Sequence, residues 1–538
     1  MATLGSVQAM LPTSISGAAL VALCIWIIYR ISRIGARDKR LPPGPPTVPI
    51  LGNLHLVPRT GMGLKLKEWG ETYGGIYSLK FGSGTVIVLF DRKAVHHLLD
   101  KKGVLYSERP QSYVPSLVTG GDSFAFMNST PLWRAERKVA VHNLSPKMLE
   151  EKVGHIQDAE SVVLLANMLD RPEGYYTHIK RTTSSVASAV VWGHRGPTME
   201  NFWARAVYDA MDNYSASLEP GANPPVDEFP FLKYIPERFA KWKRRALGSY
   251  KCMDDTWAEA RRRVNMRREK GIKRDSIIDS ILDGDKHSDL DVTDKQLNHF
   301  LGVIVEGGAD TTASATLTSI MYLALYPEFQ EKARKQLDAV CGTTRLPSIN
   351  DFEAIPYINC LIKEALRIHP VLPLGVPHRV NQDDWFEGML IPKDSTVILP
   401  TWALHLSERQ GYKDPEKYNP DRFLEYPRMA DSYAGSPDWQ RRDHYAYGAG
   451  RRICPGIHLA ERTQWRLNAR LLWAFEIHRK IDPQTGKPMP IDVNNYHEGI
   501  SHTPAEFPVV FKPRSQAHID LIRQEMASAA NFLKAWDD

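Results

Sequence analysis

The chain has 538 residues, of which 43% are hydrophobic, 24% are charged and 9% are aromatic. This composition is typical of a folded globular protein and excludes a disordered chain, a collagen-like repeat and a multi-span membrane protein. The 68 Lys and Arg residues exceed the 62 Asp and Glu residues by six, an excess too small to indicate nucleic-acid binding. The five cysteines are few and widely spaced, which argues against a disulfide framework and for a reducing compartment.

The N-terminal segment predicts a single membrane anchor. No Asp, Glu, Lys or Arg occurs from Ala2 to Tyr29, and a helix over Leu11–Tyr29 would be about 28 Å long, close to the thickness of a hydrocarbon core. The basic residues follow the apolar run, at 30–40, whereas a cleaved signal peptide carries its positive charge before it. The positive-inside rule therefore predicts a luminal N-terminus and a cytosolic body. The alternative is a buried globular helix.

The rest of the chain divides into a hinge, one large domain and a tail. The runs Ile76–Phe81 and Thr85–Leu89 predict a hairpin, residues 91–326 are mostly helical in pattern, and a second β-prone region covers 371–399 with a turn at Trp385–Gly388. The basic runs Lys241–Arg245 and Arg261–Arg274 fit solvated faces of amphipathic helices better than nucleic-acid contacts. The expected divisions are 1–30 (luminal end and anchor), 31–50 (basic flank and Pro-rich hinge), 51–513 (main domain) and 514–538 (amphipathic tail).

The most informative segment is Tyr447–Gly456, followed by a helical pattern over Ile457–Arg466. A lone cysteine is usually a small buried hydrophobe, but here glycines at 448, 450 and 456 let the backbone approach a bulky, flat group. A helix start just after Cys454 favours its thiolate, and Arg452 can pair with a carboxylate. A thiolate in a tight loop beside an arginine is what an axial haem-iron ligand requires.

This segment resembles the haem-binding loop F-x-x-G-x-R-x-C-x-G of the cytochrome P450 (haem-thiolate monooxygenase) superfamily, and the resemblance extends over nearly the whole chain. Gly450, Arg452, Cys454 and Gly456 match the pattern, and Tyr447 stands where Phe is usual. The resemblance implies a mainly α fold, with a large helical domain and a small β-rich region behind the N-terminal anchor. It also implies haem b, with Cys454 as the axial iron ligand, in a catalytic domain over 51–513.

Three further motifs match the superfamily. Glu364–Arg367 matches its E-x-x-R helix motif, and Pro420–Phe423 supplies the arginine that joins it, which implies a structural role. Trp133 and Arg137 are four residues apart, so they share one face of a helix. The resemblance implies that these two, with His378 and Arg452, bind the haem propionates.

The third motif is Gly307–Thr312, inside the apolar helix Phe300–Leu325. Two adjacent glycines cost a helix about 1 kcal/mol each relative to alanine. Close packing could explain them, but a flat macrocycle against the helix explains them better. The resemblance implies that Asp310 and Thr311 lie on the oxygen side of the iron and relay the protons that oxygen activation needs.

These motifs together favour a microsomal enzyme that inserts one atom of O2 into a C–H bond of a small apolar or aromatic molecule. The resemblance implies electrons from NADPH through a separate NADPH–cytochrome P450 reductase, with cytochrome b5 as a further candidate donor, at the endoplasmic reticulum membrane. The sequences of Leu41–Leu54 and Ala446–Gly456 are most similar to those of filamentous-fungal members that tailor secondary metabolites. A phenolic polyketide is therefore favoured over a terpenoid. Rival functions are an O2-independent haem-thiolate isomerase or dehydratase and a non-enzymatic haem-binding protein.

Two further sets of residues follow from the resemblance. The substrate pocket is expected at Phe124, Phe126, Leu372, Leu374, Val376 and Ile500. The reductase is expected to dock on a basic patch on the Cys454 face, formed by Arg134, Lys138, Arg441, Arg442 and Arg451.

Overall fold

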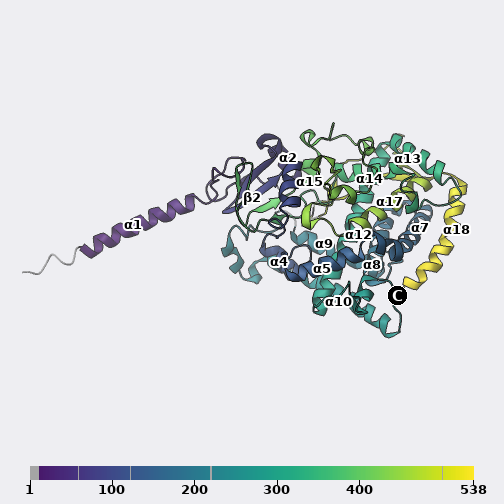
Figure 1. Cartoon of the computed structure of the whole chain (residues 1–538), viewed down its shortest axis with the longest axis horizontal. Coiled ribbons are helices and arrows are strands. Elements are labelled where there is room, and N and C mark those ends of the chain that lie inside the picture. Colours follow the sequence, from purple (N-terminus) through teal and green to yellow (C-terminus); the bar gives the residue numbers. More distant parts are fainter. Residues whose placement is uncertain (1–10, 59, 122, 219–220, 498, 500) are drawn as a thin grey trace, which may run out of the picture.

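The computed structural model describes residues 11–58, 60–121, 123–218, 221–497, 499 and 501–538, with side chains in the first helix described from Gly17 onward. The chain folds into a mainly helical body with small sheets, so the predicted mainly α fold with a small β-rich region is confirmed (Figure 1). The longer helices are α1 (Leu11–Ser32), α2 (Met62–Tyr73), α5 (Pro131–Asn143), α7 (Gly154–Asp170), α8 (Tyr175–Trp192), α9 (Phe202–Leu218), α10 (Lys241–Glu269), α12 (Asp294–Leu325), α13 (Pro327–Val340), α14 (Pro356–Ile368), α17 (Ile457–Ala474) and α18 (Gln516–Leu533). The shorter ones are α3 (Arg92–Val95), α4 (Tyr113–Thr119), α6 (Pro146–Met148), α11 (Ile277–Leu282), α15 (Thr401–His405) and α16 (Asp431–Ala434).

Helix α12 runs through the middle of the body (Figure 1). It begins six residues before the predicted start at Phe300, because Thr293 and Gln296 form a capping box that satisfies the first free N–H groups. Most of its residues are buried, against α8, α10, α14 and α17. A helix that is apolar on nearly every side must be buried in the core, and α12 is therefore the central helix on which these neighbouring helices pack.

The main sheet contains the predicted hairpin. Strands β1 (Ile76–Phe81) and β2 (Gly84–Leu89) pair antiparallel. On its other side β2 pairs parallel with β6 (Thr396–Ile398), which in turn pairs antiparallel with β3 (His378–Arg379). Outside this sheet, Trp385 and Phe386 belong to a strand rather than to the predicted turn, which is only Glu387–Gly388. The other pairs are β4 (Asp384–Phe386) with β5 (Met389–Ile391), β7 (Phe475–Arg479) with β10 (Val509–Pro513), and β8 (Tyr496–His497) with β9 (Thr503–Pro504).

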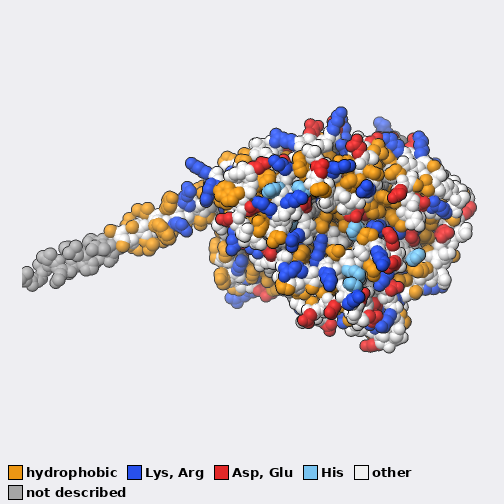
Figure 2. Space-filling view, viewed as in Figure 1, with side chains coloured by type: hydrophobic (Ala, Val, Ile, Leu, Met, Phe, Trp, Pro, Cys, Tyr) orange, Lys and Arg blue, Asp and Glu red, His pale blue; other side chains and the backbone are white. Residues whose placement is uncertain are grey.

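Helix α1 projects from the end of the body where β2 lies, and its hydrophobic side chains are exposed (Figures 1 and 2). Within the described part of the chain, no helix is both long enough and apolar enough to cross a membrane. The predicted luminal end, residues 1–10, lies outside the described residues. One member of the expected basic flank differs from the prediction, because Arg37 is half-buried and its guanidinium donates to the carbonyl oxygens of Gly44, Pro45 and Ser78.

Helix α18 packs on α7 at the far end of the body from α1 (Figure 1). Ile522, Ala529 and Leu533 are buried there, as expected for the apolar face of an amphipathic helix. One expectation for the basic runs is wrong at Arg267, which is buried rather than solvated. Its guanidinium pairs with the Asp279 carboxylate at 2.5 Å, so this charge holds α10 to α11.

Candidate active site

The cysteine loop is a tight turn that presents Cys454 at the start of α17. Gly448 and Gly450 have φ angles of 78° and 64°, which side chains rarely adopt. A Cβ on Gly450 would lie 2.1 Å from the carbonyl oxygen of Leu99, so only glycine fits. The Cys454 N–H donates to the Tyr447 carbonyl oxygen at 2.9 Å and closes the loop.

The Cys454 thiol is partly buried, and its burial raises its pKa, while the Gly456 N–H and the charge of Arg137 lower it. Burial therefore favours the thiol, whereas a bound cation would favour the thiolate. Helix α17 follows directly and packs against α12. Cys454 therefore lies just before the start of a helix that packs against α12.

Arg452 connects the cysteine loop to α5. Its guanidinium lies 3.8 Å from the centroid of the Trp133 ring and donates to the carbonyl oxygens of Ser107 and Met127, at 2.7 and 2.8 Å. Trp133 is buried near the start of α5, where Thr130 caps the helix. The predicted Trp133 and Arg452 are thus brought into direct contact.

Arg137 lies one turn further along α5 and also reaches the cysteine loop. Its guanidinium donates to the carbonyl oxygen of Ile453 at 2.5 Å and lies 6.0 Å from the Trp133 ring centroid. Burial lowers the pKa of Arg137, and the neighbouring Cys454 thiolate would raise it. The i,i+4 spacing therefore places both predicted α5 residues beside the cysteine loop.

Arg109 belongs to the same group and was missed in the sequence. It is buried, and it donates to the carbonyl oxygens of Ala125 (3.0 Å), Val376 (2.8 Å) and Pro377 (2.7 Å). Its pKa is well below the usual value because of burial and then because of the charges of Arg452 and Arg137. No local motif marks Arg109, since its partners come from segments far along the chain.

His378, in β3, lies near Arg109 and Arg452. Its Nδ1 lies 2.8 Å from the carbonyl oxygen of Tyr106. Burial, and then the nearby Arg109, lower the pKa of His378 to about 3, so the ring is neutral at physiological pH. The neutral His378 ring therefore adds no positive charge to the site, whereas the arginines do.

On the α12 side, Gly307 is exposed although most of its helix is buried, and a Cβ added there would meet nothing within 4 Å. Open space therefore lies against α12 at the predicted motif. The Thr311 hydroxyl faces the same region and donates to the Gly307 carbonyl oxygen at 2.5 Å. Asp310 is buried instead, and its Oδ2 accepts a hydrogen bond from the Ser501 hydroxyl at 2.5 Å. The two predicted relay residues thus make separate contacts.

The E-x-x-R motif forms a buried ionic network away from this space. The Arg367 guanidinium pairs with both Glu364 oxygens, at 2.7 and 2.8 Å, and neither residue is accessible to solvent. Arg422 adds a third contact to Glu364 Oε1 at 3.1 Å. Arg367 also donates to the backbone of His405 and Pro415, so the network fastens α14 to the segments that lead to the cysteine loop.

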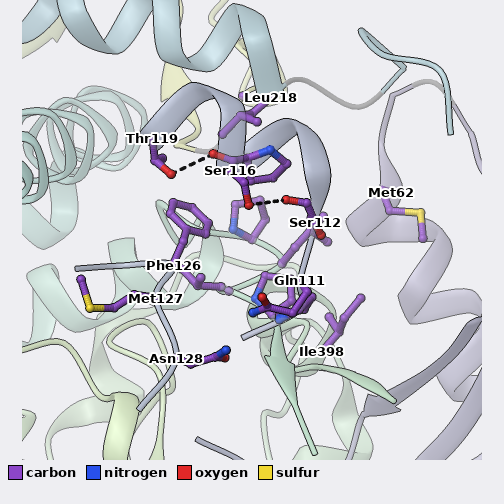
Figure 3. A pocket seen from close by; sticks show the side chains of 18 of the residues that line it. Met62, Gln111, Ser112, Ser116, Thr119, Phe126, Met127, Asn128, Leu218 and Ile398 are labelled. Carbon is purple, nitrogen blue, oxygen red and sulfur yellow. Dashed lines mark hydrogen bonds between the residues drawn. The ribbon is translucent and has the colours of Figure 1, made fainter. Parts of the chain in front are cut away.

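Arg109, Arg137 and Arg452 are together called the arginine group. A cavity of about 550 Å³ lies beside this group, between α2, α4 and β6 (Figure 3). Of the expected pocket residues, Phe126, Leu374 and Val376 line it. Phe124 does not, because it stacks on Trp133 and meets Phe300 edge-on in the core. Leu372 is also not among the lining residues, and Ile500 lies outside the described residues.

The cavity wall carries polar groups but no ionised side chain among the described residues that line it. On α4, the Ser116 and Thr119 hydroxyls already donate to carbonyl oxygens of their own helix (Figure 3). Asn128 and His502 were not anticipated from the sequence, and burial lowers the pKa of His502 to about 4, so its ring is neutral. A neutral wall of this kind suits an uncharged ligand.

The family model for cytochrome P450 matches residues 42–505. The chain belongs to the cytochrome P450 family. It is 39% identical over 532 residues to cytochrome P450 monooxygenase macC of Penicillium terrestre, which covers 97% of this chain and 98% of the relative. It is similarly related to cytochrome P450 monooxygenase acuD of Aspergillus aculeatus (39% over 529 residues; 97% and 98%) and to patI of Aspergillus clavatus (38% over 531 residues; 98% and 99%).

The arginine group of this P450 fits the haem that its family implies. Within the described residues, no carboxylate forms an ion pair with Arg109, Arg137 or Arg452, and their hydrogen bonds go to carbonyl oxygens. Burial lowers the pKa of Arg452 to about 10; the nearby Glu108 opposes this decrease, and Arg137 adds to it. Buried like charges without an anion are costly, and two propionates would supply the missing negative charge.

The expected reductase patch needs one correction in this P450. Arg442 is buried, and it donates to the carbonyl oxygens of His444, Ala434 and Gly448, so it supports the cysteine loop from within. The remaining members of the patch are exposed: Arg134, Lys138, Arg441 and Arg451.

Proposed function

We propose that this P450 is a haem-dependent monooxygenase that inserts one oxygen atom into a C–H bond of a small, uncharged, apolar or aromatic molecule. The overall reaction is R–H + O2 + NADPH + H⁺ → R–OH + NADP⁺ + H2O. The observation that carries the proposal is the group of three arginines, Arg109, Arg137 and Arg452, beside Cys454 of the glycine-rich loop. Among the described residues, no carboxylate forms an ion pair with any of the three. Its relatives, which carry the name monooxygenase, support the same activity.

The chain's own residues have separate tasks in this proposal. Cys454 would hold the haem iron, and Trp133, Arg109, Arg137, His378 and Arg452 would hold the propionates. Haem with a thiolate ligand supplies the activation of O2 by two electrons and two protons. Thr311, beside the open space at Gly307, holds a hydroxyl where a proton can be handed on, and Asp310 is the nearby acid that can resupply it. An O2-independent isomerase would need neither residue.

The substrate proposal rests on the cavity. Its volume of about 550 Å³ and its neutral wall support an uncharged molecule of modest size that carries few polar groups. Among such molecules we propose a phenolic polyketide of fungal secondary metabolism, with a terpenoid as the alternative. The fungal origin of the relatives supports this choice.

We also propose that α1 anchors the enzyme in the endoplasmic reticulum membrane, with the catalytic domain in the cytosol. Leu20, Ile25, Trp26 and Ile28 are each more than half exposed, which is costly for an apolar helix in water. Arg30 and Arg33 follow the apolar stretch and would face the cytosolic headgroups. Membrane flotation of the full chain, compared with a chain that starts at Leu41, tests this assignment.

The electron donor would be a separate NADPH–cytochrome P450 reductase, with cytochrome b5 as a further candidate. The exposed Arg134 and Lys138 of α5, with Arg451 of the cysteine loop, support a basic docking surface for an acidic flavin domain. Reversal of Arg134 and Lys138 to Glu should slow reduction by the reductase, more strongly at low salt, and leave reduction by dithionite unchanged.

The decisive test of the reaction uses isotopically labelled O2. Membranes that contain this P450 and a reductase are incubated with NADPH and a panel of phenolic and terpenoid compounds, and the products are examined by mass spectrometry. The proposal expects one labelled oxygen atom in the product and NADPH consumption. A product that forms without NADPH and without label would establish the O2-independent alternative.

A further inference from the structure

Three side-chain hydrogen bonds join one face of α12 to the segment that begins near Tyr496. Asp310 Oδ2 accepts from the Ser501 hydroxyl at 2.5 Å, the Ser314 and Thr503 hydroxyls are 2.5 Å apart, and the Thr318 hydroxyl lies 3.1 Å from the Tyr496 hydroxyl. The three α12 residues are four positions apart, so they form one stripe along the helix. Only the first of these bonds involves an ionisable carboxyl group.

The segment that carries Ser501 also forms part of the cavity wall. Gly499 and His502 line the cavity, on either side of Ser501 in the chain. Ser501 itself is half-buried, and its hydroxyl points to α12 rather than along the wall. A molecule in the cavity would therefore touch His502, which directly follows the residue that binds Asp310, and Gly499, two positions before it.

The surroundings of Asp310 make this bond its main polar contact. Burial raises the pKa of the carboxyl, and the Ser501 hydroxyl, then Lys180 of α8, lower it, whereas Asp212 of α9 raises it. Tyr176 of α8 and Tyr208 of α9 also face this region, and their own pKa values are raised, so they are neutral. No residue among these except Ser501 is within hydrogen-bond distance of the carboxyl in the described structure.

We propose that Ser501 is a positioning residue, whose hydroxyl holds the Asp310 carboxyl toward the cavity wall and away from Thr311 until a ligand in the cavity disturbs that wall. The acid is then released to resupply protons only when the cavity is filled. This inference rests on the proposed function, because it assumes that Asp310 serves proton delivery. The Ser501–Asp310 hydrogen bond would thus connect the cavity wall to the acid of the proposed proton relay.

The test follows the titration of Asp310 itself, by infrared spectroscopy of the haem-loaded protein without substrate or O2. The carboxyl band is assigned by its loss in Asp310→Asn. In Ser501→Ala the titration midpoint should rise by about one pH unit, because a hydrogen bond to the charged form is lost. Ser501→Thr keeps the hydroxyl and should restore the midpoint. Thr503→Val removes the neighbouring bond of the same stripe and should leave the midpoint unchanged.

A second measurement adds a ligand to the wild-type protein. Any compound that binds the cavity should shift the Asp310 midpoint upward, and the same compound should cause no further shift in Ser501→Ala. If Ser501→Ala does not fold, as judged by its haem content, Ser501→Val replaces it and is compared with Ser501→Thr, from which it differs only in the hydroxyl.

Two results would overturn the inference: equal midpoints in wild type and Ser501→Ala, or an equal rise in Thr503→Val, which would point to general loosening of the contact. Failure of the proposed function is a separate outcome. In that case labelled O2 would not enter any product of the wild-type enzyme, whatever the infrared midpoints show.

Discussion

The Arg452 guanidinium lies over the Trp133 ring, 3.8 Å from its centroid, although 319 positions separate the two residues in the chain. This contact holds the cysteine loop to α5 and gathers Arg137 at the same place. In the proposed haem site, the side chains that would bind the propionates are therefore already gathered by contacts within the protein. Such preorganisation reduces the cost of ordering these side chains when haem binds.

Arg109 tests the role of the arginine group. Arg109→Met should weaken haem binding by about 10- to 100-fold, because a charged donor is lost. The melting temperature of the apoprotein should change little, because relief of like-charge repulsion with Arg452 and Arg137 offsets the loss of the hydrogen bonds to three carbonyl oxygens. Haem titration and thermal denaturation measure the two effects, with Arg451→Met, an exposed neighbour, as control. Equal haem affinity in both variants would remove Arg109 from the site.

Thr311→Ala tests proton delivery. The hydroxyl beside Gly307 is lost, so product formed per NADPH should fall by about 10- to 100-fold while peroxide rises. Thr316→Ala removes a similar hydroxyl that bonds to the backbone further along α12 and serves as control. Unchanged coupling in Thr311→Ala would contradict the assigned role and favour the O2-independent alternative.

The buried network around Glu364 should dominate the stability of the α14 region. Glu364→Ala leaves Arg367 buried without its carboxylate, and the free energy of unfolding should fall by about 3–5 kcal/mol. Urea denaturation measures this loss. Glu416→Ala, which removes a carboxylate from an exposed ion pair with Lys67, should cost less than about 1 kcal/mol. Similar losses in the two variants would contradict the structural role of the motif.

Glu306 should make stability depend on pH. Burial raises its pKa from 4.5 to about 7, with a smaller opposing effect from the Trp257 N–H at 3.0 Å. Between these values the folded state binds more protons than the unfolded state, so stability is greatest at the acidic end and falls as pH rises to about 7, by about 3 kcal/mol. In Glu306→Gln this decrease should be smaller, although Glu461, raised to about 8, still contributes. An identical pH profile for wild type and Glu306→Gln would contradict the assignment.

Local features of the site could be predicted from the sequence because their signals are local. The cysteine loop, the i,i+4 pair on α5 and the β1–β2 hairpin each lie within a segment of at most 14 residues, Ile76 to Leu89 for the hairpin. The spacing of glycines and charged residues is enough to identify them.

Contacts between distant segments could not be predicted in this way. Arg109 and Ser501 have no motif, because the carbonyls and the carboxyl that they bind lie far along the chain. Arg442 and Arg267 read as surface charges, since a sequence of basic residues does not reveal which one is buried. Phe124 illustrates the same limit, because an aromatic residue near a pocket can equally belong to the core behind it.

We propose that Cys454 holds the haem iron, and the absorption spectrum of the reduced, CO-bound protein reports that ligand. The wild-type protein should show the long-wavelength Soret band that a thiolate ligand gives, and Cys454→Ala should lack it. Cys360→Ala, at another buried cysteine, should retain the band at full intensity. Persistence of the band in Cys454→Ala would contradict the account, since the iron would then be held by another sulfur.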